Sequence, residues 1–154
     1  MINESKKYLM IGKSEQKYLR DYYNEHCFQL VKKERRYRIQ EGDNWCAMFV
    51  SVMAHKMGLG AVKFPYEVSV MEQMKIAKER GIFFTDRSKI KPNDLILFDW
   101  DKNGWADHVG FVVKVGKDLI TSIEGNFQGT VNYRTVSIHS KSIYGFIGLD
   151  YGVY

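Results

Sequence analysis

Proline and cysteine are scarce in this chain, with two of each among 154 residues. So little proline, together with only 13 glycines, excludes collagen-like sequences and proline-rich disorder. Two cysteines do not make the disulfide framework on which many small secreted domains depend. A chain of this length does not need one, because it buries roughly 68–70% of the surface that its unfolded form exposes. We therefore expect one domain, residues 1–154, that folds around its own hydrophobic core.

Long apolar runs are also missing. No stretch of about 18 apolar residues occurs, so we expect no membrane-spanning helix. The first residues, MINESKKYLMIGKSEQKY, contain neither an apolar stretch of about 7–15 residues nor a small-residue cleavage site. The sequence therefore predicts a protein that is made in the cytoplasm without a signal peptide.

Acidic residues are too few to balance the basic ones in the first quarter of the chain. Residues 1–40 hold ten Lys and Arg against five Asp and Glu, whereas residues 41–154 hold 13 of each. We expect residues 1–40 to form a basic helical region of the same domain. Its charge is densest at Lys32, Lys33, Arg35, Arg36 and Arg38. Such a patch attracts anionic polymers, unless it is simply a solvated helix face. Because Tyr37 is the sole aromatic residue in the cluster, we expect no nucleic-acid partner.

The chain changes character at Gly81. Before it, the spacing of apolar residues predicts helices over residues 14–33, from Trp45 to a stop at Gly58, and over residues 66–80. The helix after Trp45 is apolar nearly all round, which is typical of a buried helix. After Gly81, the pattern predicts five short strands: Asp94–Trp100, His108–Val115, Asp118–Glu124, Val131–Ser137 and Ile143–Tyr151. Helices followed by antiparallel strands predict an α+β fold.

Cys46 has the setting of a reactive cysteine. It follows the turn Gly42-Asp43-Asn44 and begins the buried helix. The free N–H groups and the positive dipole end at a helix N-terminus favour the thiolate, which is the nucleophilic form. A lone cysteine on an apolar helix is more often a packing residue, so a catalytic role requires a partner. Cys27, in the amphipathic stretch EHCFQLV, is expected to be a small buried hydrophobic residue.

His108 is the partner that the sequence offers. It stands in ADHVGFVV, where a strongly apolar strand begins and fixes its backbone. A histidine at a strand end that faces a helix N-terminus can act as a general base. The other histidines are weaker candidates, because His26 and His55 lie on predicted helices near basic residues and His139 lies in a polar turn.

Glu124 and Asn126 complete the candidate site. Glu124 ends the strand after the one that His108 begins, so a hairpin of adjacent strands brings both to one sheet edge. A carboxylate there can accept the proton of the second imidazole nitrogen, which fixes the tautomer and stabilises the imidazolium. By strand alternation, Asn126 is expected to point the same way and to support either the ring or the oxyanion. Gly125 lets the backbone come close.

Three segments in this order, NWCAMFVS, NDLILFDWDKNGWADHVGFVV and IEGNF, resemble the CHAP domain. This papain-like family of cysteine, histidine-dependent amidohydrolases and peptidases cuts peptidoglycan, and the resemblance covers about residues 40–150. It implies N-terminal helices packed on an antiparallel sheet of about five to six strands. It also implies that Cys46 is the nucleophile, His108 the base, Glu124 the acidic orienting residue and Asn126 the family's asparagine. The last segment, SIYGFIGLDY, resembles the closing strand of many phage endolysins in the family.

An acidic loop leads into His108. It carries oxygen-bearing side chains at positions 1, 3, 5 and 9 and glycine at position 6, as in the first part of an EF-hand calcium loop. The candidate calcium ligands are Asp99, Asp101, Asn103 and Asp107. Position 12 holds Gly110 in place of glutamate, and the alternative is a polar hairpin turn held by Asx hydrogen bonds. Some phage members of the family carry a calcium loop before the nucleophile, but QEGDNW has too few carboxylates there. We expect no cofactor for the chemistry itself, so any calcium would be structural.

The resemblance implies a peptidoglycan hydrolase that cleaves an amide bond through a thioester. It would be an N-acetylmuramoyl-L-alanine amidase or a peptide or cross-bridge endopeptidase. We interpret the chain as the catalytic domain of a phage endolysin that reaches the bacterial cell wall through a holin or within a larger protein. We expect a monomer whose basic region binds anionic wall polymers. The alternatives are a bacterial papain-like cell-wall peptidase, an antibacterial toxin, and a basic wall-binding or nucleic-acid-binding module in which Cys46 is structural.

Overall fold

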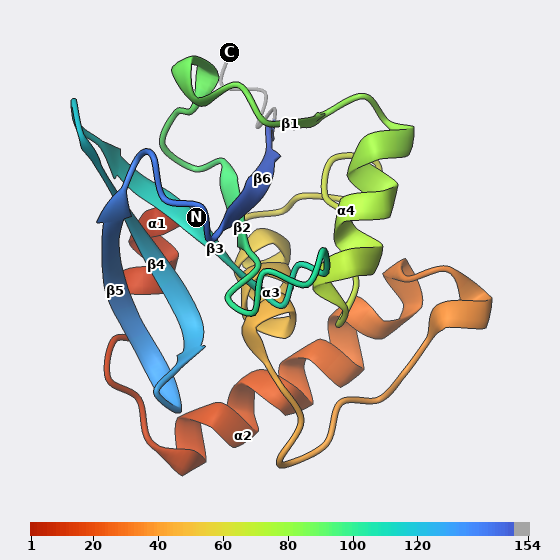
Figure 1. Cartoon of the computed structure of the whole chain (residues 1–154). Coiled ribbons are helices and arrows are strands. Elements are labelled where there is room, and N and C mark those ends of the chain that lie inside the picture. Colours follow the sequence, from red (N-terminus) through yellow and green to blue (C-terminus); the bar gives the residue numbers. More distant parts are fainter. Residues whose placement is uncertain (150–154) are drawn as a thin grey trace.

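The computed structural model describes residues 1–149 and shows an α+β fold in which the helices precede the main strands (Figure 1). The α-helices are α1 (Ile2–Lys6), α2 (Lys13–Tyr22), α3 (Cys46–Lys56) and α4 (Val70–Glu79). The strands are β1 (Phe83–Phe84), β2 (Leu95–Phe98), β3 (His108–Val115), β4 (Leu119–Phe127), β5 (Thr130–Ser137) and β6 (Ile143–Ile147). This arrangement confirms the predicted fold class, a papain-like fold of N-terminal helices on an antiparallel sheet.

The strands form one antiparallel sheet in the order β1-β6-β2-β3-β4-β5. Strand β3 has the bounds that the sequence predicts. Strand β1 is only two residues long, too short to leave a periodic pattern, and was not expected. Strand β6 ends at Ile147, earlier than predicted. The last residues of the predicted strand, 150 and 151, lie outside the described residues.

The first long helix is shorter than predicted. Helix α2 ends at Tyr22, a π-helical turn follows over Tyr23–Cys27, and a 3₁₀ turn over Phe28–Leu30 closes the segment. The continuous helix expected over residues 14–33 is therefore wrong. Tyr23 and Cys27 are both buried in the core that surrounds α3, so packing overrides regular helical propensity here.

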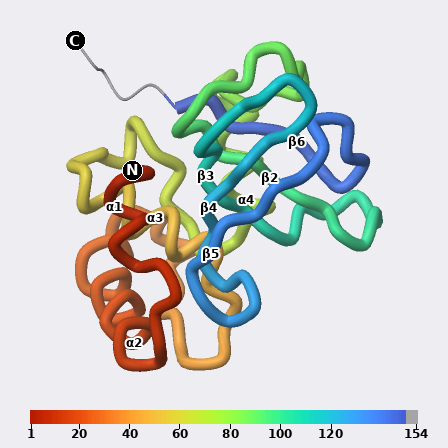
Figure 2. The backbone as a smooth tube through the Cα atoms, turned by 90° about the vertical axis from the view of Figure 1, so that its left-hand side faces the viewer, coloured from red at the N-terminus to blue at the C-terminus, as the bar shows by residue number. Residues whose placement is uncertain are grey.

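Helix α3 lies at the centre of the fold and supplies one wall of the site. Every residue from Cys46 to Ala54 is buried, as the apolar pattern predicts. The helix ends before Gly58, whose φ of +81° is the left-handed conformation typical of a helix stop. Figure 2 shows α1, α2 and α3 gathered on one side of the sheet. At Gly125 a side chain would place its Cβ 2.4 Å from the Cβ of Phe49, so glycine allows β4 to pack directly on α3.

The sheet buries both of its faces. Along β2, Leu95 and Leu97 join the large core on the helix side, whereas Ile96 and Phe98 join a smaller apolar cluster on the other face. This alternation follows the two-residue period of a strand. Among residues 1–149, no helix is long and apolar enough to cross a membrane.

The basic cluster is only partly a solvated surface. Arg35 forms a two-contact ion pair, at 3.0 and 3.2 Å, with Glu67, which is 2% exposed. Arg36 donates to the carbonyl oxygens of Val31 and Gln29. Arg38 donates to the Asn24 carbonyl oxygen at 3.2 Å, so three of the five basic residues contact other parts of the chain and do not simply face solvent.

Candidate active site

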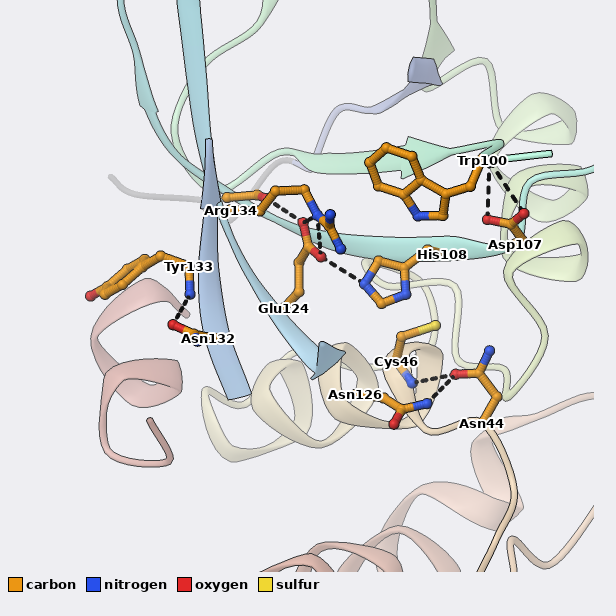
Figure 3. A network of polar contacts seen from close by, with 11 residues as sticks. Asn44, Cys46, Trp100, Asp107, His108, Glu124, Asn126, Asn132, Tyr133 and Arg134 are labelled. Atoms are coloured by element: carbon orange, nitrogen blue, oxygen red, sulfur yellow. Dashed lines mark hydrogen bonds and ion pairs between the residues drawn. The ribbon is translucent and has the colours of Figure 1, made fainter. Parts of the chain in front are cut away.

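The structure brings Cys46 and His108 together although they are 62 positions apart in the sequence (Figure 3). Cys46 is the first residue of α3 and His108 the first residue of β3, and α3 packs against β3. Both residues are nearly buried, at 2% and 7% exposure. The Cys46 sulfur and the His108 ring lie next to each other (Figure 3). A rigid helix end thus presents sulfur to a rigid strand end that carries a ring nitrogen.

Glu124 holds the opposite side of the ring. Its Oε1 lies 2.7 Å from His108 Nε2, and the carboxylate is fully buried. Strands β3 and β4 are antiparallel neighbours, as the predicted hairpin requires. Gly110 makes the contact possible, because a Cβ there would lie 2.5 Å from Glu124 Cγ. Since Nε2 faces the carboxylate, Nδ1 is the nitrogen left for Cys46.

Two residues that the sequence analysis missed complete the surroundings of Glu124. Ser122 Oγ donates to Oε2, and Arg134 Nε donates to both carboxylate oxygens at 2.9 and 3.0 Å. The guanidinium lies between the rings of Trp100 and Phe127, at 4.4 and 4.0 Å from their centroids. Ser122 and Arg134 are cross-strand partners on β4 and β5. The sequence alone could have indicated Ser122, because alternation along β4 puts it on the same face of the strand as Glu124. It could not have indicated Arg134, because the pairing register of β4 and β5 is known only from the structure.

This network makes His108 a cation at neutral pH. Burial lowers the pKa of His108, but its interactions with Cys46 and with the Glu124 carboxylate outweigh burial and raise the pKa to about 9. An imidazolium held between a sulfur and a carboxylate can donate a proton to a leaving group.

Asn126 does not follow strand alternation, so that expectation is wrong. The β4–β5 register shifts between Glu124 and Phe127, and Asn126 adopts a positive φ of 59°. Its Nδ2 donates to Asn44 Oδ1 at 3.0 Å, and the backbone N–H of Cys46 donates to the same oxygen at 3.3 Å. Asn126 thus lies beside Cys46 at the start of α3 (Figure 3).

The acidic loop closes on its own backbone. Side-chain oxygens of Asp99, Asn103 and Asp107 accept hydrogen bonds from backbone N–H groups of the same loop. Asp101 is exposed. The donors are the N–H groups of Trp100, Asn103, Gly104 and Trp105, at 2.8–3.3 Å. These are the Asx-type bonds of the alternative interpretation. In the described part of the chain, no group of three or more His, Cys, Asp or Glu could hold a metal ion. Calcium stays a prediction, which melting temperatures measured with EDTA and with added calcium would test.

The fold and this cysteine–histidine–carboxylate arrangement define a class of papain-like hydrolases, and a comparison with protein families gives the same class. The CHAP domain matches residues 21–126, more than half of the chain. The chain therefore belongs to the CHAP domain family, whose members are cysteine, histidine-dependent amidohydrolases and peptidases. All four candidate residues lie inside the matched range. None of the curated proteins compared with the chain matches it.

Proposed function

We propose that the protein is a peptidoglycan hydrolase that cleaves an amide bond with Cys46 as nucleophile. The observation that carries the proposal is the connected array Cys46–His108–Glu124, nearly buried and held by three different elements of the fold. Membership of the CHAP domain family supports peptidoglycan as the substrate. The amide is either the N-acetylmuramoyl-L-alanine bond or a bond in the peptides.

The first step forms a thioester. The Cys46 thiolate attacks the carbonyl carbon of the scissile amide, and a C–S bond forms. The imidazolium of His108 gives the proton at Nδ1 to the departing nitrogen as the C–N bond breaks. Glu124, bound at Nε2, keeps the ring oriented and stabilises its charge.

The second step is hydrolysis. Neutral His108 takes a proton from water, the oxygen attacks the thioester carbonyl, and the C–S bond breaks. The carboxylic acid leaves, and Cys46 returns as a thiolate beside the imidazolium. Atoms and charges balance over both steps without a cofactor.

The oxyanion is stabilised where two donors already converge. The Cys46 N–H and Asn126 Nδ2 both point to one oxygen, that of the Asn44 side chain. We assign this point to the substrate oxyanion, which replaces the Asn44 oxygen when the substrate binds. Asn44 then acts as a cap on the empty oxyanion hole.

At the cellular level, the proposal is a phage endolysin catalytic domain that acts on the bacterial cell wall. The net positive charge of residues 1–40 supports attraction to anionic wall polymers. Release through a holin, or delivery within a larger protein, would bring the domain to the wall. A cell-wall peptidase or toxin of bacterial origin would use the same chemistry.

Digestion of purified peptidoglycan tests the proposal. Wild-type protein is expected to release fragments whose new amine and carboxyl ends, identified by mass spectrometry, define the bond that is cut. Cys46→Ala should release none, whereas the matched control Cys27→Ala should release the same fragments as wild type. Equal activity of Cys46→Ala, or no new ends with wild type, would overturn the proposal in favour of a binding module.

A further inference from the structure

A polar pocket of about 380 Å³ opens next to the proposed nucleophile. Asn44, Trp45 and Asn126 line the pocket beside the start of α3. Asn126 and Asn44 also make the hydrogen bonds at the Cys46 backbone. A substrate whose scissile carbonyl reaches Cys46 therefore has part of its chain at the mouth of this pocket.

Two walls of opposite charge enclose the pocket. One wall is the face of α2 that carries Lys13, Gln16 and Arg20, and it is tied to the β4–β5 turn by a bond of 2.7 Å from Gln16 Nε2 to the Gly129 oxygen. The other wall is the loop that carries Glu41 and Asp43.

The opposite charges do not neutralise each other across the pocket. In residues 1–149, no ion pair within 4 Å joins Lys13 or Arg20 to an acidic side chain, and Glu41 has none to a basic one. Asp43 is already used by the loop, because it accepts from Tyr37 Oη at 2.9 Å and from the Gln40 N–H at 2.8 Å. Arg20 on one wall and Glu41 on the other are therefore available to a ligand.

We propose that this pocket is a substrate subsite for a peptide segment that carries both a free carboxylate and a free amine. Arg20, helped by Lys13, binds the carboxylate, and Glu41 binds the amine. Stem peptides that contain a diamino acid have this chemistry. The inference rests on the proposed function and adds to it the part of the substrate that is recognised.

Binding is tested apart from turnover. Isothermal titration calorimetry on the Cys46→Ala variant compares a synthetic stem peptide with its carboxyl-amidated and amine-acetylated forms. Each blocked group is expected to weaken binding by up to about fivefold, the upper end of the range for a solvent-exposed ion pair. Equal affinity of all three peptides would overturn the subsite.

Variants assign each charge to its wall. Arg20→Gln should lose the preference for the free carboxylate but keep the preference for the free amine. Arg20→Lys should keep part of the carboxylate preference. Glu41→Gln should lose the amine preference and keep the carboxylate preference. Lys17→Gln, on the same helix but paired with Asp21 at 2.6 Å and outside the pocket, is the matched control and should change neither preference. If Arg20→Gln keeps the full carboxylate preference, the assignment is wrong.

Turnover separates this inference from the proposed function. In the Cys46-containing protein, Arg20→Gln should raise KM for the free peptide with little change in kcat. Cleavage of all three peptides with equal KM would leave the hydrolase intact and refute the subsite. Absence of cleavage of any peptide and of whole peptidoglycan would refute the hydrolase itself, and the subsite with it.

Discussion

The protein contains two buried cysteines in different environments, and only one has the partners of a nucleophile. Cys27 lies in the π-helical turn, and its sulfur faces the Ser51 carbonyl oxygen at 3.9 Å. Burial raises the pKa of the Cys27 thiol to about 12. Cys46 is the first residue of a helix and lies beside His108, whose pKa is raised to about 9. Burial in apolar surroundings makes a cysteine unreactive, whereas a neighbouring positive charge favours the nucleophilic thiolate.

Two histidines repeat the comparison. His55 Nδ1 meets the hydroxyl of Tyr22 at 2.7 Å, and burial, with the charges of His26 and Lys56, lowers the pKa of its ring. His108 meets the Glu124 carboxylate at the same distance, and its pKa rises. Cys46 and the Glu124 carboxylate, which His55 lacks as neighbours, therefore raise the pKa of one ring while burial lowers that of the other.

Of all the substitutions considered, replacement of His108 should lower kcat most, and replacement of His55 is its control. His108→Ala is expected to lower kcat about a thousandfold or more, because both proton transfers are lost. His55→Gln removes a half-buried ring from the same protein and should leave kcat within about twofold. Release of peptidoglycan fragments and circular dichroism of both variants provide the measurement. Similar losses in two folded variants would contradict the comparison.

Loss of the proposed oxyanion donor should come next. Asn126→Ala is expected to lower kcat about a hundredfold with little change in KM, because the donor acts on the developing charge. Asn44→Ala removes the cap and should lower kcat far less. Kinetics on a soluble muropeptide measure both. A larger loss in Asn44→Ala would show that Asn44 itself contacts the reacting atoms.

Substitution of Arg134 should lower kcat less than loss of Asn126 and should also shift the dependence of activity on pH. We expect kcat to fall about tenfold in Arg134→Gln, because a buried carboxylate loses a charged donor. With wild type, activity should fall as pH rises through about 9, where His108 loses its proton. Without the guanidinium, the Glu124 carboxylate stabilises the imidazolium of His108 more strongly, so the alkaline limb should shift to higher pH. Arg134→Lys should restore part of kcat, and an unchanged limb in Arg134→Gln would contradict the charge argument.

The basic cluster should show the smallest effect on chemistry. Lys32→Gln with Lys33→Gln should weaken lysis of whole cells at low salt severalfold, and hydrolysis of a soluble muropeptide should change little, because surface attraction is screened over about 8–10 Å at physiological salt. Arg35→Gln is the contrasting variant, since it leaves buried Glu67 unpaired and should cost about 1–3 kcal/mol of stability. Equal loss of both activities in the lysine variant would place the two lysines in the substrate groove.

The sequence predicted the parts of the site that depend on strong local patterns. The all-round apolar helix placed Cys46, and the apolar strand that begins at His108 has the predicted bounds. Long-range register was beyond such patterns. Arg134 reaches Glu124 only because β5 pairs with β4, and the turn of Asn126 depends on a bulge that no alternation reveals. Helix α2 ends at Tyr22, earlier than predicted, for a similar reason. The following residues pack in the core around α3, and the local sequence does not show this contact.

Alkylation of the two cysteines by iodoacetamide tests the central claim most directly. Peptide mass spectrometry of the folded protein at neutral pH gives a rate for each thiol. We predict that Cys46 is modified and that Cys27 stays unmodified until the protein unfolds. In His108→Ala, modification of Cys46 should slow markedly, while Cys27 is unchanged. Equal rates at Cys27 and Cys46 in the folded wild type, or a Cys46 rate that does not depend on His108, would contradict the assignment of Cys46 as the nucleophile.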